Sequence, residues 1–241
     1  MLYFDSLTHI TVNGRWFQTR HEASIDRLLR ELEAVAPARA CLVAIASELM
    51  PNDLVAKVCN QYHDLLVPIA GLDPNTLTSL RDTHAYIKQL VEQGFRGIKL
   101  HPRFNHFDLA DTQVDWVLDA ASKWGLIVFL CTMLRGAFRT PSAAPVDLVH
   151  SMLCRYPEAG CVLLHGGTTD LLAFSDMIRP FPNVLLDLAF TLLRYQGSSL
   201  DIDMRFVLQN LDRRCCVGSD FPEYTPADAR RRVLELSALL C

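Results

Sequence analysis

The stretch Cys216-Val217-Gly218-Ser219-Asp220-Phe221-Pro222 is an apolar, strand-like run that leads directly into an acidic residue. A carboxylate at the mouth of a buried strand must be desolvated, hydrogen-bonded or bound to a cation, so Asp220 marks a candidate site. Two other runs end in the same way, since Val162-Leu163-Leu164 leads into His165 and Gly97-Ile98-Lys99-Leu100 leads into His101. Polar groups placed repeatedly at strand ends predict one shared pocket.

Strand-like and helix-like segments alternate along the chain, which predicts a (β/α)8 TIM barrel of the α/β class. The strands read as nearly continuous apolar runs, as expected of parallel strands that are covered on both faces. The predicted strands are Tyr3–Asp5, Ala40–Ala46, Leu66–Leu72, Gly97–Leu100, Ile127–Cys131, Cys161–Leu164, Val184–Leu188 and Cys215–Gly218. The predicted helices are Ser24–Val35, Leu80–Gln93, Val114–Lys123, Pro145–Arg155, Asp170–Ile178, Met204–Leu211 and Pro226–Leu240. No linker or repeat divides residues 1–241, so one domain is expected, with an open doubly wound sheet as the alternative architecture.

The composition favours a cytoplasmic protein that acts on a small molecule. Half of the 241 residues are hydrophobic, yet no apolar run is long enough to cross a membrane, and no secretory signal is recognisable. The net charge of −4 and the lack of a basic stripe argue against nucleic acid as a partner. The eight cysteines include no CxxC pair and most lie in apolar runs, so we expect reduced thiols.

Four short motifs, taken together, resemble the metal-dependent amidohydrolase superfamily. They are Phe4-Asp5-Ser6-Leu7-Thr8-His9-Ile10, Gly94-Phe95-Arg96-Gly97-Ile98-Lys99-Leu100-His101-Pro102, Leu163-Leu164-His165-Gly166-Gly167 and Gly218-Ser219-Asp220-Phe221-Pro222. They occur in the order and at the strand positions of the branch that contains aminocarboxymuconate-semialdehyde decarboxylase and many small hydrolases. The resemblance implies a TIM barrel, a hydrolase or carbon–carbon lyase (decarboxylase) activity, and a homodimer.

The resemblance also implies a divalent metal, usually zinc, held by a His-x-His pair on the first strand, a His on the fifth and an Asp on the eighth. His9 and Asp220 match this pattern, and His165 matches a sixth-strand histidine that assists the chemistry. Leu7 stands at the first histidine position and Cys131 at the fifth-strand position. Leucine binds no metal whereas a thiolate does, so the metal ligands expected here are His9, Cys131 and Asp220. Loss of a donor weakens such a site, and a metal-free enzyme is the alternative.

The predicted catalytic residues are Asp220, as the general base that takes a proton from water, and His165, which polarises the scissile carbonyl or stabilises the oxyanion. The predicted substrate-binding residues follow the fourth and fifth strands: Lys99, His101, Arg135 and Arg139. Arginines on the rim favour a carboxylate-bearing substrate. Two alternatives stay open. One is a metal-independent, lactonase-like hydrolase, and the other is a non-catalytic barrel that binds a small molecule or a partner subunit.

Overall fold

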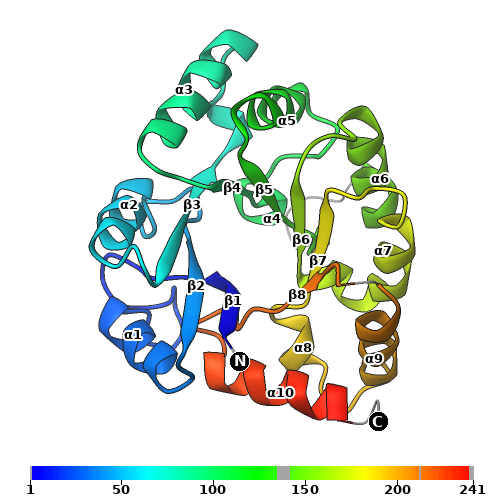
Figure 1. The fold of residues 1–241 in the computed structure, drawn as a ribbon. Helices are drawn as coiled ribbons and strands as arrows, with labels where there is room; N and C mark the ends of the chain where they lie inside the picture. Colours follow the sequence, from blue (N-terminus) through cyan, green and yellow to red (C-terminus); the bar gives the residue numbers. More distant parts are fainter. Residues whose placement is uncertain (1, 135–141, 212, 239–241) are drawn as a thin grey trace.

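The computed structural model describes residues 2–134, 142–211 and 213–238, which form a barrel of parallel strands surrounded by helices (Figure 1). Within these ranges, the strands follow sequence order around one eight-stranded sheet. They are β1 (Tyr3–Thr8), β2 (Ala38–Val43), β3 (Leu66–Leu72), β4 (Gly97–Leu100), β5 (Ile127–Cys131), β6 (Cys161–Leu164), β7 (Val184–Asp187) and β8 (Cys215–Cys216). The predicted TIM barrel is confirmed.

Helices separate successive strands and cover the outside of the barrel (Figure 1). The α-helices are α1 (Ile25–Glu33), α2 (Asn52–Gln61), α3 (Leu80–Glu92), α4 (Pro102–Asn105), α5 (Thr112–Trp124), α6 (Pro145–Arg155), α7 (Leu171–Met177), α8 (Thr191–Arg194), α9 (Leu200–Asn210) and α10 (Pro226–Ala238). The 3-10 segment η1 (Pro74–Thr76) follows β3, and η2 (His165–Asp170), a turn whose φ angles are positive from His165 to Thr168, follows β6. Among the described helices, none is long and apolar enough to span a membrane.

The barrel closes between β8 and β1 through a mixture of backbone and side-chain hydrogen bonds. The N–H of Ser6 donates to the carbonyl of Val217 at 3.1 Å, and the N–H of His9 donates to the carbonyl of Phe221 at 2.8 Å. The carboxylate of Asp5 adds a link by accepting from the N–H of Ser219 at 2.9 Å. Closure places the segment after β8, including Asp220, beside the end of β1.

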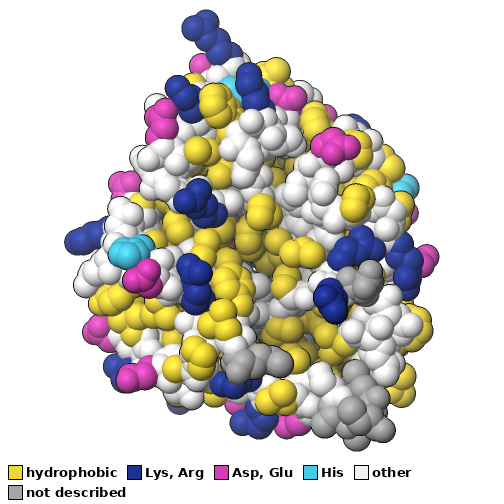
Figure 2. All heavy atoms as spheres, viewed as in Figure 1, with side chains coloured by type: hydrophobic (Ala, Val, Ile, Leu, Met, Phe, Trp, Pro, Cys, Tyr) yellow, Lys and Arg dark blue, Asp and Glu magenta, His cyan; other side chains and the backbone are white. Residues whose placement is uncertain are grey.

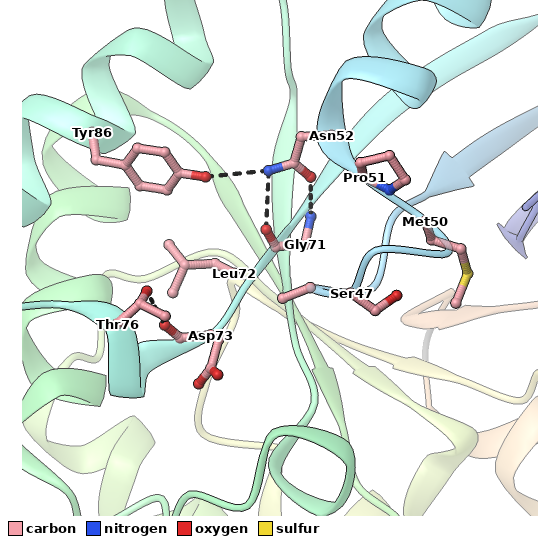
Figure 3. Close-up of a pocket in the computed structure, with 10 residues that line it drawn as sticks. Ser47, Met50, Pro51, Asn52, Gly71, Leu72, Asp73, Thr76 and Tyr86 are labelled. Carbon is pink, nitrogen blue, oxygen red and sulfur yellow. Dashed lines mark hydrogen bonds between the residues drawn. The ribbon is translucent and has the colours of Figure 1, made fainter. Parts of the chain in front are cut away.

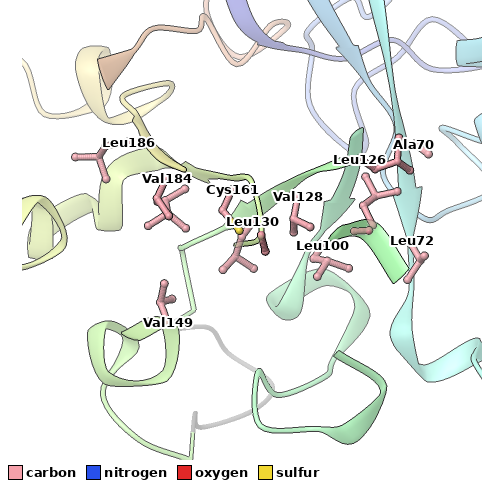
Figure 4. Packing of buried hydrophobic residues seen from close by; sticks show 14 of the residues in the cluster. Ala70, Leu72, Leu100, Leu126, Val128, Leu130, Val149, Cys161, Val184 and Leu186 are labelled. Atoms are coloured by element: carbon pink, nitrogen blue, oxygen red, sulfur yellow. The ribbon is translucent and has the colours of Figure 1, made fainter. Parts of the chain in front are cut away.

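Alternation of side chains along the strands produces two apolar layers. Outward-facing residues such as Val128 and Leu130 belong to the layer between strands and helices (Figure 4). The barrel interior holds a smaller cluster that includes Leu7 and Phe129. Cys131 lies two positions after Phe129, and Lys99 pairs with Phe129 in the register of β4 and β5. Both residues therefore share the inward face, because side chains two positions apart, or paired across strands, point to the same side.

Several exposed apolar side chains lie away from the strand ends that the motifs occupy. Hydrophobic side chains lie over the middle of the face in Figure 2, with Lys and Arg side chains among them. Phe4, Ile127 and Leu185 are each more than a third exposed and lie in the first two residues of β1, β5 and β7. The polar motifs all follow the opposite, carboxyl ends of the strands, where TIM barrels build their active sites.

Candidate active site

The carboxyl ends of the strands surround a cavity of about 750 Å³. Five polar side chains that the sequence singles out line this cavity: His9, Lys99, His101, His165 and Asp220. They lie on β4 or in the segments that follow β1, β4, β6 and β8. The structure thus brings together residues that are far apart in the chain. Of the other predicted site residues, Cys131 is fully buried at the end of β5, whereas Arg135 and Arg139 lie outside the described residues.

His9 is held in one tautomer by the backbone of β2. Its Nδ1 lies 2.6 Å from the carbonyl oxygen of Val43, and because a carbonyl only accepts, Nδ1 carries the proton. Its Nε2 therefore presents a lone pair, which lies 3.2 Å from Nζ of Lys99. Burial and the nearby charge of Lys99 hold the pKa of His9 well below its ordinary value of 6.5. The ring is neutral and stacks on Trp16 at a centroid distance of 5.3 Å.

His165 and Asp220 both adopt backbone conformations that are uncommon for residues with a side chain. Their φ angles are +67° for His165 and +55° for Asp220, in the left-handed region. Such conformations cost about 1–3 kcal/mol each and cluster at functional sites, where surrounding contacts enforce them. Gly167 has φ +75°, and a Cβ there would lie 2.2 Å from the ring of Phe174, so the turn after β6 requires glycine.

Cys131 and His165 form a hydrogen-bonded pair beneath the cavity. Nδ1 of His165 lies 3.1 Å from the carbonyl oxygen of Ala189, so Nδ1 is the donor and Nε2 is the nitrogen left for other partners. Burial acts to raise the pKa of the Cys131 thiol. The hydrogen bond with His165 and the positive charges of His165 and Lys99 outweigh burial, and the pKa is lowered from 9.0. The hydrogen bond and the positive charge of Lys99 therefore favour the thiolate form of Cys131.

Aromatic residues that the sequence analysis did not single out form the walls of the cavity. Trp16, Phe17, Phe104 and Phe190 line it. Trp16 is fixed by a hydrogen bond from its Nε1 to Oε1 of Glu223 at 2.6 Å. The signal available in the sequence is their position, because each lies in the segment that follows a strand, namely β1, β4 or β7. Aromatic residues in loops are common for many reasons, so the signal is weak.

A second cavity, of about 320 Å³, lies between the segment after β2 and the end of β3 (Figure 3). Asn52 exchanges two hydrogen bonds with Gly71: its Nδ2 donates to the Gly71 carbonyl at 3.1 Å, and its Oδ1 accepts the Gly71 N–H at 2.8 Å. The amide also donates to the hydroxyl of Tyr86 at 3.2 Å (Figure 3). These groups satisfy one another and fix the end of β3, so we place the candidate active site in the larger cavity.

The expected metal ligands are not gathered around one point. Nε2 of His9 lies 3.6 Å from Oδ1 of Asp220, but Nζ of Lys99 lies 3.2 Å from the same nitrogen. Cys131 is hydrogen-bonded to His165 instead, and Leu7 is packed in the barrel interior. Within residues 2–134, 142–211 and 213–238, no group of three or more His, Cys, Asp or Glu side chains is placed to hold a metal ion. The donor set therefore does not fit the metal that the resemblance implies.

Comparisons with known proteins agree with this fold. A family model described as Amidohydrolase matches residues 5–239. No curated protein matches the sequence. A solved structure of an uncharacterised TIM-barrel protein from Bordetella bronchiseptica is 15% identical, with a TM-score of 0.78, over 98% of this chain and 91% of that one.

Two further structures carry described functions. A probable 2-pyrone-4,6-dicarboxylic acid hydrolase from Acinetobacter baumannii, with citric acid bound, is 17% identical with a TM-score of 0.71, over 99% of this chain and 93% of that one. A 5-carboxyvanillate decarboxylase from Novosphingobium aromaticivorans, complexed with manganese and a nitrobenzoic acid, is 14% identical with a TM-score of 0.69, over 96% and 89%. At these identities the likeness shows the fold. Because the family model covers nearly the whole chain, this protein belongs to the amidohydrolase family.

Proposed function

We propose that this protein hydrolyses a small, planar, carboxylate-bearing ester or lactone, with Asp220 as the general base. The observation that carries the proposal is the convergence of Lys99, His165 and Asp220 on one cavity with aromatic walls. Flat aromatic walls favour a planar substrate. The family supports hydrolysis or decarboxylation. We favour hydrolysis because Asp220 is placed at the cavity to activate water and because a probable dicarboxylic acid hydrolase shares this fold.

Asp220 is positioned to activate water. Its carboxylate lines the cavity, and its Oδ1 lies 3.6 Å from Nε2 of His9, too far for a strong hydrogen bond. The carboxylate accepts a proton from a water molecule as the water oxygen attacks the substrate carbonyl carbon. The same proton then passes to the leaving oxygen, so that a carboxylic acid and an alcohol are formed. General base catalysis of this kind contributes about 10²–10⁴-fold to the rate.

His165 polarises the carbonyl only when Nε2 carries a proton, because Nδ1 already donates to Ala189. The buried thiol of Cys131 is the group that supplies this proton, since its pKa is lowered by the hydrogen bond with His165 and by nearby positive charge, against the effect of burial. An N–H donor of His165 at the cavity stabilises the oxyanion that forms when water attacks.

Arginines support a carboxylate-bearing substrate. Arg103 lines the main cavity and also an adjoining cavity of about 330 Å³, which Arg194 lines as well. Guanidinium groups bind carboxylates through two parallel hydrogen bonds. We therefore place the substrate carboxylate near Arg103, with the reactive carbonyl towards Asp220. Arg135 and Arg139 stay predictions for the same role.

The test is turnover of carboxylate-bearing lactones and esters by wild-type protein and by Asp220→Asn. We expect the variant to lose about 10²–10⁴-fold in kcat while its circular dichroism spectrum stays unchanged. Asp176→Asn is the matched control, because this carboxylate is 85% exposed on α7 and pairs with Arg179. Equal turnover by wild type and Asp220→Asn would refute the assignment. Release of carbon dioxide from carboxylated phenols, with no lactone or ester turnover, would identify a decarboxylase instead.

A further inference from the structure

Lys99 is a buried cation at the centre of the candidate active site. It lies on β4, faces the barrel interior and is 3% exposed. Its Nζ lines the main cavity and lies 3.2 Å from Nε2 of His9. Since Nδ1 of His9 carries the proton, Nε2 accepts a hydrogen bond from the ammonium group. The lone pair that a metal ion would need is thus already used.

The surroundings of Lys99 are those of a cation site. Asp220 approaches the same nitrogen of His9, with Oδ1 3.6 Å from Nε2. Burial lowers the pKa of Lys99, and the negative charges of Asp220, Cys131 and Asp187 act in the opposite direction. An ammonium group has three N–H donors, so the bond to His9 leaves two for Asp220, water or substrate.

We infer that the ammonium group of Lys99 takes the place of a divalent cation in this chain. It binds the lone pair of His9, lies beside Asp220 and presents a fixed positive charge to the substrate carbonyl. Leu7 contributes no donor and is fully buried among the interior apolar residues, so the first-strand position next to His9 supplies no second imidazole for a metal. The catalytic part of this inference rests on the proposed function, whereas the exclusion of a metal does not.

The experiment compares wild type, Lys99→Met and Lys57→Met, all purified without chelators and titrated with Co²⁺. Metal content, the visible absorption of Co²⁺ and the thermal unfolding midpoint are measured. We expect wild type and Lys57→Met to hold no stoichiometric metal and to show no Co²⁺-dependent rise in midpoint. Lys57 is an exposed residue of α2 and serves as the control. Lys99→Met frees Nε2 of His9, and we expect it to bind Co²⁺ at least about tenfold more tightly than wild type.

Hydrolysis is measured on the same proteins. We expect Lys99→Met to lose about 10²–10³-fold in kcat with a smaller change in KM, because a group that stabilises the oxyanion acts mainly in the transition state. Lys57→Met keeps the wild-type rate. Stoichiometric metal in folded wild type would overturn the inference even if Lys99→Met fails to fold. Undiminished hydrolysis by Asp220→Asn would refute the proposed function, while the Co²⁺ titration would still decide the role of Lys99.

Discussion

Replacing Asp5 by Asn is expected to change how stability depends on pH. Asp5 is fully buried on β1, where Oδ1 accepts from the N–H groups of Leu7 at 3.2 Å and Ser219 at 2.9 Å, and Oδ2 accepts from the hydroxyl of Tyr3 at 3.2 Å. Burial raises its pKa from 3.8 to about 7, although the bonds from Ser219 and Leu7 act to lower it. An amide has the same shape and does not ionise; its oxygen accepts from Leu7 and Ser219, and its N–H₂ donates to the Tyr3 hydroxyl.

The folded pKa of Asp5 lies above the unfolded value, so the folded protein binds this proton more tightly. The resulting stabilisation is fully present below pH 3.8 and is lost as the pH rises through about 7. At about 1.4 kcal/mol for each tenfold change in proton affinity, the full effect is about 4 kcal/mol, of which about 3 kcal/mol falls between pH 5 and pH 8. Asp5→Asn should not show this decrease in stability, because its amide does not ionise.

Urea unfolding of both proteins at pH 5 and pH 8 measures the difference. Between pH 5 and pH 8, the free energy of unfolding of wild type should fall by about 3 kcal/mol more than that of Asp5→Asn, with equal m-values. Titrating groups that do not interact with Asp5 are common to both proteins and cancel in the comparison, whereas the charge of Asp187 acts on Asp5 and belongs to the measured difference. If the two proteins lose the same free energy between pH 5 and pH 8, the burial argument for Asp5 is wrong.

Two further substitutions test the site and its support. Gly167→Ala should destabilise the protein by more than Gly125→Ala. Both glycines have positive φ (+75° and +72°), but only at Gly167 would a Cβ lie within 2.2 Å of another side chain. Chemical denaturation measures the free energy of unfolding of both variants, and an equal decrease in the two would contradict the packing argument. Cys131→Ser should lower kcat by about tenfold or more without raising KM, since a serine hydroxyl does not protonate His165. The measurement is the dependence of kcat on pH in both proteins, and an unchanged profile would show that the thiol plays no part.

Much of the barrel could be predicted from the sequence, because buried parallel strands leave a strong apolar signal. The observed bounds of β3, β4, β5 and β6 equal those predicted. The bounds of the other strands differ from the predicted ones, as β1 and β8 show. β1 extends to Thr8 because a register shift against β2 allows the chain to continue past Asp5. β8 ends at Cys216, and the segment after it joins β1 through separate backbone bonds and the carboxylate of Asp5.

The helix α2 was absent from the predicted helices, and its start signal is weak. Its N-cap is Pro51, which provides no side-chain hydrogen bond. The inward residues Val55, Val58 and Cys59 are nevertheless buried at helical spacing. Packing against the neighbouring strands therefore decides this helix, and that packing is not visible in the local sequence.

For the candidate site, the sequence predicted which positions would meet but not what each atom would contact. Strand ends of one closed barrel share one face, so the convergence of His9, His165 and Asp220 follows from the order of the strands. The tautomer of His9 depends on the carbonyl of Val43, which only the folded register places 2.6 Å from Nδ1. The contact with Lys99 depends in turn on that tautomer, and the family pattern alone indicated a metal instead.

A lysine in place of a metal restricts the chemistry of the site. A catalytic zinc ion lowers the pKa of its bound water to about 7, so hydroxide is available near neutral pH. An ammonium group carries a single charge and does not ligate water, so in the proposed mechanism activation of water falls to Asp220, with Lys99 and His165 stabilising the oxyanion. That combination suits a carbonyl that is already electrophilic, such as that of a lactone or an activated ester. It suits an amide poorly, because the amide needs stronger activation and a better proton donor for its leaving nitrogen. The contact between Lys99 and His9 therefore bears on the class of substrate as well as on the absence of a metal ligand set in the described residues.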